Sequence, residues 1–514
     1  MKSGLHLLTN STWNAAAFVV AVGLNLLALP FVVFHLGVAS FGVAGLVAAC
    51  VAPALIFSSS LSLIIVREFA QLLTPERRPE ARDFFATSLF IGIVGSLAIG
   101  TIIVVAGPAL ARHVFSLSGD IAGDLHAAFV YGVLAWAFQC LAGIFLALFT
   151  ARQDYARLAL AMIVSTVVST GLMFCVIPLW PQPSTYLGCQ MAGAATNLVF
   201  SASIARLMFG GWLSPPALHR RPFSEIFRRG KWLVIGQSGG VVSNQTDRYL
   251  LGIFLSPQNV GYYLVAQRLE EAIYAGILKV GEILFPFFAS IQGHDDARVG
   301  DLFFRSAWVL NVLAVSALGA VIPVAGEVLY LWAGADVATE GQNVLSILAI
   351  AGILGCGTNV FRFYLLANGR TGISAINSMV TAFSTLSVGA VVLPYYGWIA
   401  AGWSSCAGAL AQIIFIVFII ERSFKLPDVW PRIWYFIILP MIAGVSCALM
   451  LRAWVGPFYK GEIVIWWQVA ALYGMSVTAI SACVIVLSVI GRYRAIFLGD
   501  IYRVAERFLP VRDR

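Results

Sequence analysis

Long apolar runs, separated by short polar segments, recur along the whole chain. A helix needs about 20 residues to cross a bilayer, and fourteen runs approach or exceed that length. Pro30, Pro53, Pro286 and Pro323 lie inside or near the ends of these runs and predict kinks or breaks. We expect about 14 transmembrane helices at these approximate positions: 11–36, 41–66, 84–110, 126–150, 157–180, 184–210, 232–255, 260–290, 302–324, 342–367, 372–396, 397–420, 433–452 and 464–490.

The composition agrees with this pattern. Of the 514 residues, 60% are hydrophobic and only 11% are charged, whereas soluble domains are about 25% charged. The net charge of +8 does not indicate a nucleic-acid partner, because the basic residues lie in short loops between the apolar runs. We therefore expect an all-α polytopic membrane protein that binds membrane lipid and no nucleic acid.

The distribution of basic residues predicts the orientation of these helices. Of the 32 lysines and arginines, 23 lie in the termini and in alternate loops on one side, and three lie in the loops on the other. Lysine and arginine are enriched in cytoplasmic loops. We therefore expect an even number of spans, with both termini in the cytoplasm.

An internal repeat divides the chain. The stretch LGVASFGVAGLVA, which begins at Leu36, corresponds to LSPQNVGYYLVAQ, which begins at Leu255, at an offset of 219 residues that also relates Gly42 to Gly261. A basic segment follows the sixth run, so the two halves share one orientation. We expect two six-helix bundles related by pseudo-two-fold symmetry, and the division of the chain is as follows: first bundle 1–215, basic cytoplasmic linker 216–231, second bundle 232–421, two extra helices 422–490 and an amphipathic cytoplasmic tail 491–514.

Charged and polar residues are concentrated in the seventh and eighth runs. The seventh carries a polar stripe at helical spacing, formed by Gln237, Asn244, Asp247 and Arg248. The eighth carries two pairs of opposite charge three residues apart, Arg268 with Glu271 and Lys279 with Glu282. An ionised group at the bilayer centre costs about 2.5–3.5 kcal/mol on insertion scales, so such groups face a partner or water.

Two interpretations of these charges remain open. They form ion pairs that lock helices together, or they line an aqueous cavity between the two halves. We favour the cavity, since the charges exceed what locking needs. Fixed cations there would hold an anionic headgroup such as a pyrophosphate. The candidate substrate-binding residues are Arg248, Arg268, Lys279, Arg305, Arg362, Gln237 and Asn244, and the ion-coupling candidates are Asp247, Glu271 and Glu282.

The sequence carries no enzyme motif: no P-loop, no HExxH and no GxSxG. Its eight cysteines and six histidines show no metal-ligand spacing. We expect no catalytic residue, no metal and no cofactor, so any energy for transport must come from an ion gradient, the membrane potential or the substrate gradient.

Two stretches resemble bacterial polysaccharide flippases of the Wzx type, in the multidrug/oligosaccharidyl-lipid/polysaccharide exporter superfamily. One is Thr9 to Ala49. The other is DRYLLGIFLSPQNVGYYLVAQRL, Asp247 to Leu269, followed by ILFPFFASI, Ile283 to Ile291. The resemblance implies two six-helix bundles around a central cationic cavity. By position, Arg248, Arg268 and Lys279 correspond to the cationic residues that line this cavity. Glu270, Glu271 and Glu282 depart from a purely cationic lining.

The function that the resemblance implies is translocation of undecaprenyl-pyrophosphate-linked oligosaccharide repeat units across the bacterial inner membrane, by alternating access, for O-antigen, capsule or exopolysaccharide synthesis. A polysaccharide polymerase and a co-polymerase are further expected partners. Two alternatives stay open: an ion-coupled exporter of small amphipathic drugs, and a non-transporting membrane scaffold of a glycan-assembly complex.

Overall fold

The structure is a computed structural model, and it describes residues 2–115, 121–282, 284, 288, 296–368, 370–423, 428–455 and 465–490. Helices occupy nearly all of these ranges, and no strand is assigned in them. The predicted tail helix (491–514) and most of the 283–291 motif lie outside the described residues.

Two compact units divide the chain. The first comprises Met1–Val265 and Thr385–Ala401, and the second comprises Ala266–Ser384 and Gly402–Arg514. The boundary at Val265 falls inside one helix, α9, which therefore begins in the first unit and ends in the second. The boundaries of the two six-helix bundles expected from the sequence stay a prediction.

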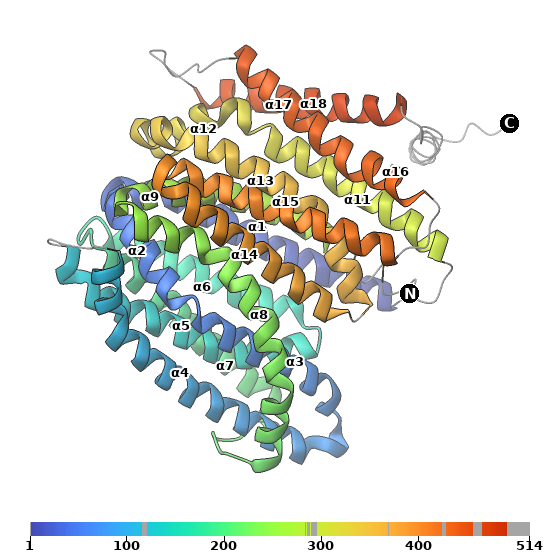
Figure 1. The fold of residues 1–514 in the computed structure, drawn as a ribbon. Coiled ribbons are helices and arrows are strands. Elements are labelled where there is room, and N and C mark those ends of the chain that lie inside the picture. The colour runs from blue at the N-terminus through green and yellow to red at the C-terminus, as the bar shows by residue number, and fades with distance from the viewer. Residues whose placement is uncertain are drawn as a thin grey trace. The chain divides into compact units, whose positions relative to one another are not determined.

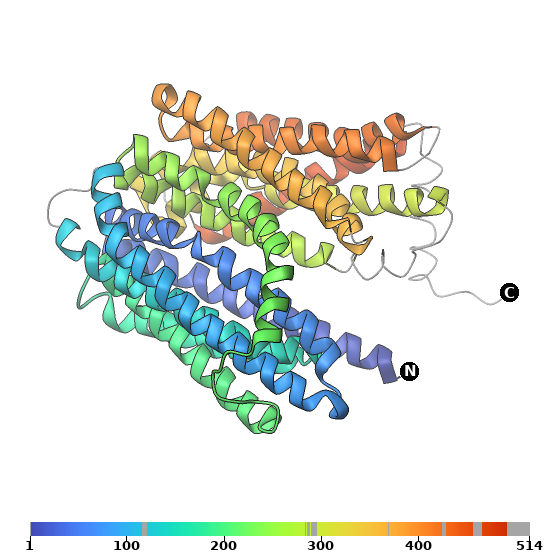
Figure 2. The ribbon, with the colours of Figure 1, turned by 60° about the horizontal axis from the view of Figure 1, so that its bottom comes forward.

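The first unit contains eight complete helices and the first turns of the ninth. Their bounds are α1 Lys2–Leu36, α2 Val38–Val51, α3 Ala54–Leu72, α4 Arg78–Val114, α5 Ile121–Ala151, α6 Tyr155–Val176, α7 Pro183–Phe209, α8 Arg220–Phe254 and α9 Pro257–Gly281, with a 3-10 turn at Pro75–Arg77. Within this unit α5 packs along α7 and α4, and α3 packs on α5 and α8 (Figures 1 and 2). Phe69, Phe85 and Phe149 are fully buried in the core that these helices share.

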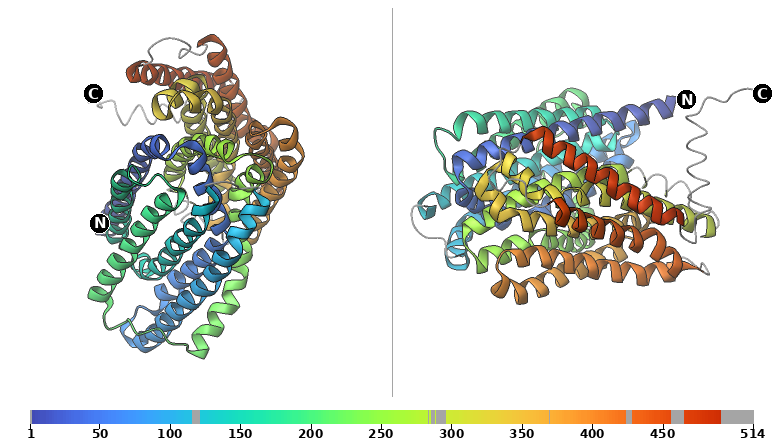
Figure 3. Two further views of the ribbon diagram at one scale, coloured as in Figure 1. Left: turned by 90° about the vertical axis from the view of Figure 1, so that its left-hand side faces the viewer. Right: turned by 90° about the horizontal axis from the view of Figure 1, so that it is seen from above.

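The second unit is built around two buried helices, α11 and α13. Its elements are α11 Asp296–Gly319, a 3-10 turn at Ile322–Val324, α12 Ala325–Ala333, α13 Ala335–Ala367, α14 Thr371–Tyr396, α15 Ile399–Ser423, α16 Val429–Ile433, a π-helical turn at Trp434–Ile438, α17 Leu439–Val455 and α18 Trp466–Ile490. The second half of α14 and the first residues of α15, Thr385–Ala401, belong to the first unit. In the most apolar stretches of the spans Val299–Ala333, which begins in α11, and Ala335–Leu365 of α13, 78% of residues are buried. α17 and α18 pack on each other and on α11 (Figure 3). Phe303, Phe361 and Phe436 form the centre of this core.

Twelve candidate membrane spans occur among the described residues, judged by length and hydropathy. The expected all-α polytopic fold is confirmed. Helices also form at the seventh and eighth predicted runs, as α8 and α9, but they are not among the twelve. Their charged residues are the physical difference from the other spans.

Two predicted boundaries have clear outcomes. The kink or break predicted at Pro53 is confirmed, since the run at 41–66 is divided at Ala52–Pro53 into α2 and α3, whereas α1 continues without a break through Pro30. Proline has no backbone N–H to donate and its ring clashes with the carbonyl four residues earlier, which explains the break. The expected turn at Tyr396–Gly397 is confirmed: α14 ends at Tyr396, and Gly397 has a φ of +63°, which glycine adopts without strain.

Candidate functional site

A close helix crossing in the first unit brings the two repeats together. A Cβ atom added to Gly42 on α2 would overlap the carbonyl oxygen of Pro257 on α9. A Cβ added to Gly261 on α9 would overlap the carbonyl oxygen of Val38 on α2. Glycine at both positions therefore lets the two backbones touch.

This crossing is reciprocal. The repeat offset of 219 residues relates Gly42 to Gly261 and also Val38 to Pro257. Each glycine thus contacts the repeat counterpart of the residue that the other glycine contacts. Such an exchange of equivalent contacts is what a local two-fold axis produces. The weak repeat seen in the sequence has a structural counterpart at this point.

Asp247 and Arg248 of α8 are buried beside the crossing, with exposed fractions of 7% and 8%. The hydroxyl of Tyr263, on the first half of α9, donates a hydrogen bond of 2.7 Å to Asp247 Oδ2. Arg248 Nη1 donates one of 3.2 Å to Gln245 Oε1. The two charges on α8 are therefore enclosed and hydrogen-bonded.

The other members of the predicted stripe on α8 are more accessible. Gln237 is half-buried and Asn244 is exposed. Tyr249 Oη, one residue beyond Arg248, donates a hydrogen bond of 2.8 Å to the carbonyl oxygen of Ala49 on α2. Sequence reasoning missed both tyrosines that hold α8. The Gly-Tyr-Tyr segment at 261–263 was the signal that could have drawn attention to Tyr263.

The second half of α9 presents charges differently. Arg268 Nη1 lies 3.1 Å from Glu271 Oε2, and Lys279 Nζ lies 2.9 Å from Glu282 Oε2. These pairs, which the three-residue spacing predicted, are confirmed. Their side chains keep between 34% and 49% of their surface exposed. The pairs run along one helix and leave the cations accessible.

In the second unit, a group of polar side chains joins the second half of α9 to α13. Asn359 Nδ2 donates a hydrogen bond of 2.7 Å to Tyr274 Oη. Glu270 points at α13 as well, since a Cβ added to Gly352 would lie 2.5 Å from Glu270 Oε1. Glu270 and Glu271 therefore have different neighbours, although they are adjacent in the sequence: α13 for the first and Arg268 for the second.

The remaining two predicted cations lie elsewhere in the second unit. Arg305 of α11 forms an ion pair of 2.9 Å with Asp301, and Arg432 bridges Asp301 and Asp428, each at 3.1 Å. Arg305 therefore belongs to a network that ties α11 to α16. Arg362 is exposed on α13. Within the described ranges no group of three or more His, Cys, Asp or Glu residues is placed to hold a metal ion.

Comparison with known sequences shows the family. The profile of the family described as "Polysaccharide biosynthesis protein" matches residues 7–292, more than half of the chain. A Shigella flexneri protein named as a candidate O-antigen transporter is 19% identical over 410 residues, which cover 78% of this chain and 94% of that protein.

Comparison with solved structures shows the same fold. The inward closed conformation of the lipid II flippase MurJ matches with a TM-score of 0.70 at 10% identity, covering 95% of this chain and 99% of that one. The inward-facing conformation of a multidrug resistance MATE family transporter of the MOP superfamily matches with a TM-score of 0.60 at 14% identity, covering 80% and 94%.

These matches confirm the resemblance expected from the two sequence stretches. The fold is that of a multi-pass membrane transporter, and the proteins that share it are named as flippases and transporters rather than enzymes. The chain belongs to the polysaccharide biosynthesis protein family.

Proposed function

We propose that the protein is a flippase that carries undecaprenyl-pyrophosphate-linked oligosaccharide repeat units across the bacterial inner membrane by alternating access. Membership of the polysaccharide biosynthesis family supports a glycan substrate. The name of the Shigella relative supports an O-antigen or similar surface polymer. A lipid II flippase of the same fold supports a lipid-linked form of that substrate.

The observation that carries this proposal is the accessibility of the cations on the second half of α9. Arg268 is the twelfth residue of the 25-residue helix α9 and lies about 16 Å from the start of the helix, at 1.5 Å per residue. At that depth an exposed charge facing lipid would cost about 2.5–3.5 kcal/mol. Water facing the Arg268–Glu271 and Lys279–Glu282 pairs removes this cost, and an aqueous path for a polar headgroup supplies that water.

The chemistry of these pairs suits a pyrophosphate. Guanidinium and ammonium groups form strong, charge-assisted hydrogen bonds with phosphate oxygens. While no substrate is bound, Glu271 and Glu282 hold Arg268 and Lys279 along the helix. An arriving pyrophosphate displaces the carboxylates, which are then free to accept protons or sodium ions. Glu271 and Glu282 are thus the ion-coupling candidates of this proposal.

The other candidate residues receive different roles. Arg248 and Asp247 are enclosed, and Arg305 is paired with Asp301, so we assign these three to holding helices in place. Asn244 and Arg362 are exposed and Gln237 is half-buried, so each of them stays a candidate for substrate binding.

The glycine crossing is assigned to the closed end of the transport path. At Gly42 and Gly261 its two backbones pack without intervening side chains. The bias of basic residues supports cytoplasmic termini, which places the Gly42–Gly261 crossing on the outer side. A polymerase and a co-polymerase would act on the repeat units delivered there.

The experiment that tests the function is transfer of a fluorescent polyprenyl-pyrophosphate oligosaccharide in proteoliposomes. Dithionite quenches only the label on the outer leaflet, so transfer appears as a loss of the protected fraction. We expect transfer to exceed that of protein-free vesicles at least tenfold. Transport of a small amphipathic cation without transfer of the lipid-linked sugar would establish a drug exporter instead. Transport of neither, by a folded protein, would support a scaffold.

A further inference from the structure

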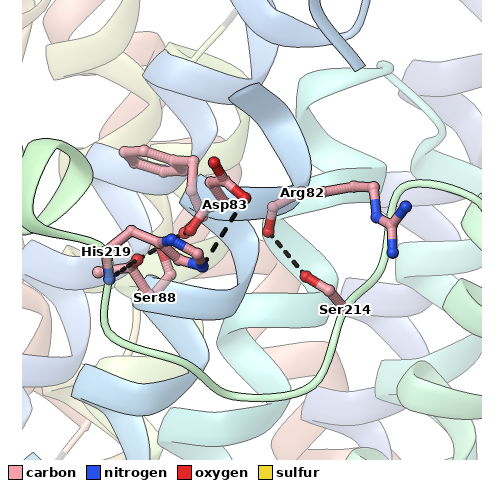
Figure 4. Close-up of polar contacts among 7 residues, drawn as sticks. Arg82, Asp83, Ser88, Ser214 and His219 are labelled. Carbon is pink, nitrogen blue, oxygen red and sulfur yellow. Dashed lines mark hydrogen bonds and ion pairs between the residues drawn. The ribbon is translucent and has the colours of Figure 1, made fainter. Parts of the chain in front are cut away.

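The linker between α7 and α8 is tied along the first turns of α4. Arg78 Nε donates a hydrogen bond of 2.8 Å to the carbonyl oxygen of Gly211, and Ser214 Oγ donates one of 3.0 Å to that of Arg82. Farther along, the N–H of His219 donates to Thr87 Oγ1 at 3.1 Å. Figure 4 shows the linker passing over α4, with Ser214 bonded to Arg82 and His219 beside α4. The linker therefore has a fixed position on α4.

A pocket of about 360 Å³ lies between this linker and α4. Its polar lining comes from Arg82, Asp83, Ser214 and His219. The side chain of Arg82 is exposed, and its guanidinium has no hydrogen bond or ion pair within the described part of the chain. Asp83 Oδ1 lies 3.7 Å from His219 Nε2 (Figure 4). One available cation beside an acid favours a singly charged phosphodiester over a multiply charged anion.

An apolar groove lies farther along the same helix. It has a volume of about 420 Å³ and runs between α4 and α5, with Leu97, Gly100, Thr101 and Val104 on one wall and Val133 on the other. Only 17% of the most apolar stretch of α4 is buried, the smallest share among the twelve candidate spans. The groove is therefore on a helix that presents most of its surface to lipid.

The pocket and the groove share one face of α4. Pro79, Arg82, Asp83 and Ala86 in the pocket are each 18 residues before a residue of the groove: Leu97, Gly100, Thr101 and Val104. Eighteen residues make five turns at 3.6 residues per turn, so the two sets point in the same direction. Arg82 precedes Ile93, the first groove residue, by about 16 Å of helix axis.

We propose that this face of α4 binds an anionic phospholipid, with the phosphodiester at Arg82 and one acyl chain directed along α4 into the groove. The acyl chain reaches the near end of the groove at Ile93, because one leaflet with its headgroup region is about 20–22 Å thick, half of the roughly 40–45 Å bilayer. Arg220 and Arg221, at the start of α8 directly after His219, are exposed and add positive charge beside the pocket. This lipid site holds the linker on α4 and does not depend on the proposed substrate.

Native mass spectrometry of the purified full-length protein tests the site, with dioleoyl phosphatidylglycerol as the probe. Arg82→Gln removes the available cation, and Arg77→Gln is its control, since Arg77 is already paired with Glu80 at 2.7 Å. Ile93→Trp fills the near end of the groove, and Val94→Trp places the same bulk on an exposed neighbour outside it. We expect Arg82→Gln to weaken binding about tenfold and Ile93→Trp about fivefold, with each control within about twofold of wild type.

Phosphatidylcholine with the same chains should bind more weakly than phosphatidylglycerol, and millimolar inorganic phosphate should not displace the lipid. Equal affinity in either variant–control pair would overturn the proposal. Displacement by inorganic phosphate would show a site for a free anion, and tighter binding of a polyprenyl monophosphate would show a site for the carrier lipid; both results would overturn the phospholipid assignment.

Discussion

The two halves of helix α9 differ in almost every physical respect. From Val260 to Val265 each residue is buried, Gly261 contacts the backbone of α2, and the hydroxyl of Tyr263 is bound to Asp247. From Arg268 onward the helix carries two ion pairs whose side chains are a third to a half exposed. The boundary between the two compact units falls between these halves, after Val265.

This difference shows that charge in a membrane helix has two distinct uses. A buried carboxylate with a hydrogen-bond donor fixes the position of a neighbouring helix, and removing either partner leaves a polar group without compensation. An exposed ion pair contributes little to stability, because water screens it. Under the proposed function, one end of this helix holds the fold and the other binds a polar ligand.

The largest expected effect is at the crossing. We expect Gly261→Ala to destabilise the protein by about 3 kcal/mol, because the added methyl group overlaps the backbone carbonyl of Val38 and cannot be accommodated by a side-chain rotation. Gly276→Ala is the control on the same helix, where an added Cβ meets no described atom within 4 Å. Thermal unfolding in detergent measures both. Equal melting temperatures would contradict the close packing of the first half.

The next effect concerns the buried carboxylate. We expect Asp247→Ala to destabilise by about 2 kcal/mol, since Tyr263 Oη loses its acceptor in a buried site. The matched change Asn244→Ala, one turn earlier on α8, should cost less than about 0.5 kcal/mol because Asn244 is exposed. The two variants are compared by unfolding in detergent. A larger loss for Asn244→Ala would reverse the assignment of structural and accessible positions on α8.

The smallest stability effect is expected in the second half. Arg268→Gln and Lys279→Gln should each change the free energy of unfolding by less than about 1 kcal/mol, because each breaks an exposed pair within one helix. The same unfolding assay measures this, at low and at high salt. A loss of several kcal/mol in either variant would show that these charges lock the helices, which was the alternative interpretation of the sequence.

Much of the helical framework could be predicted from the sequence. Apolar runs placed the helices, the spacing of Arg268 and Glu271 predicted their ion pair, and the repeat pointed to Gly42 and Gly261. Periodicity could not separate Asp247 from Asn244. The two lie on one face of α8, but burial depends on which segment covers each turn, and Tyr263 on another helix encloses only Asp247. The direction of Glu270 toward α13 was likewise beyond a pattern confined to one helix.

The most direct measurement is the rate at which the Arg268→Gln/Lys279→Gln double variant transfers a labelled polyprenyl-pyrophosphate oligosaccharide in proteoliposomes, relative to wild type at equal amounts of folded protein. We expect at least a tenfold lower rate with nearly unchanged stability, since each lost charge-assisted contact to phosphate is worth about 1.5–3 kcal/mol. The Arg77→Gln variant, changed outside α9, should transfer at the wild-type rate. Equal rates for the double variant and wild type would contradict a role for the second half of α9 in handling the headgroup.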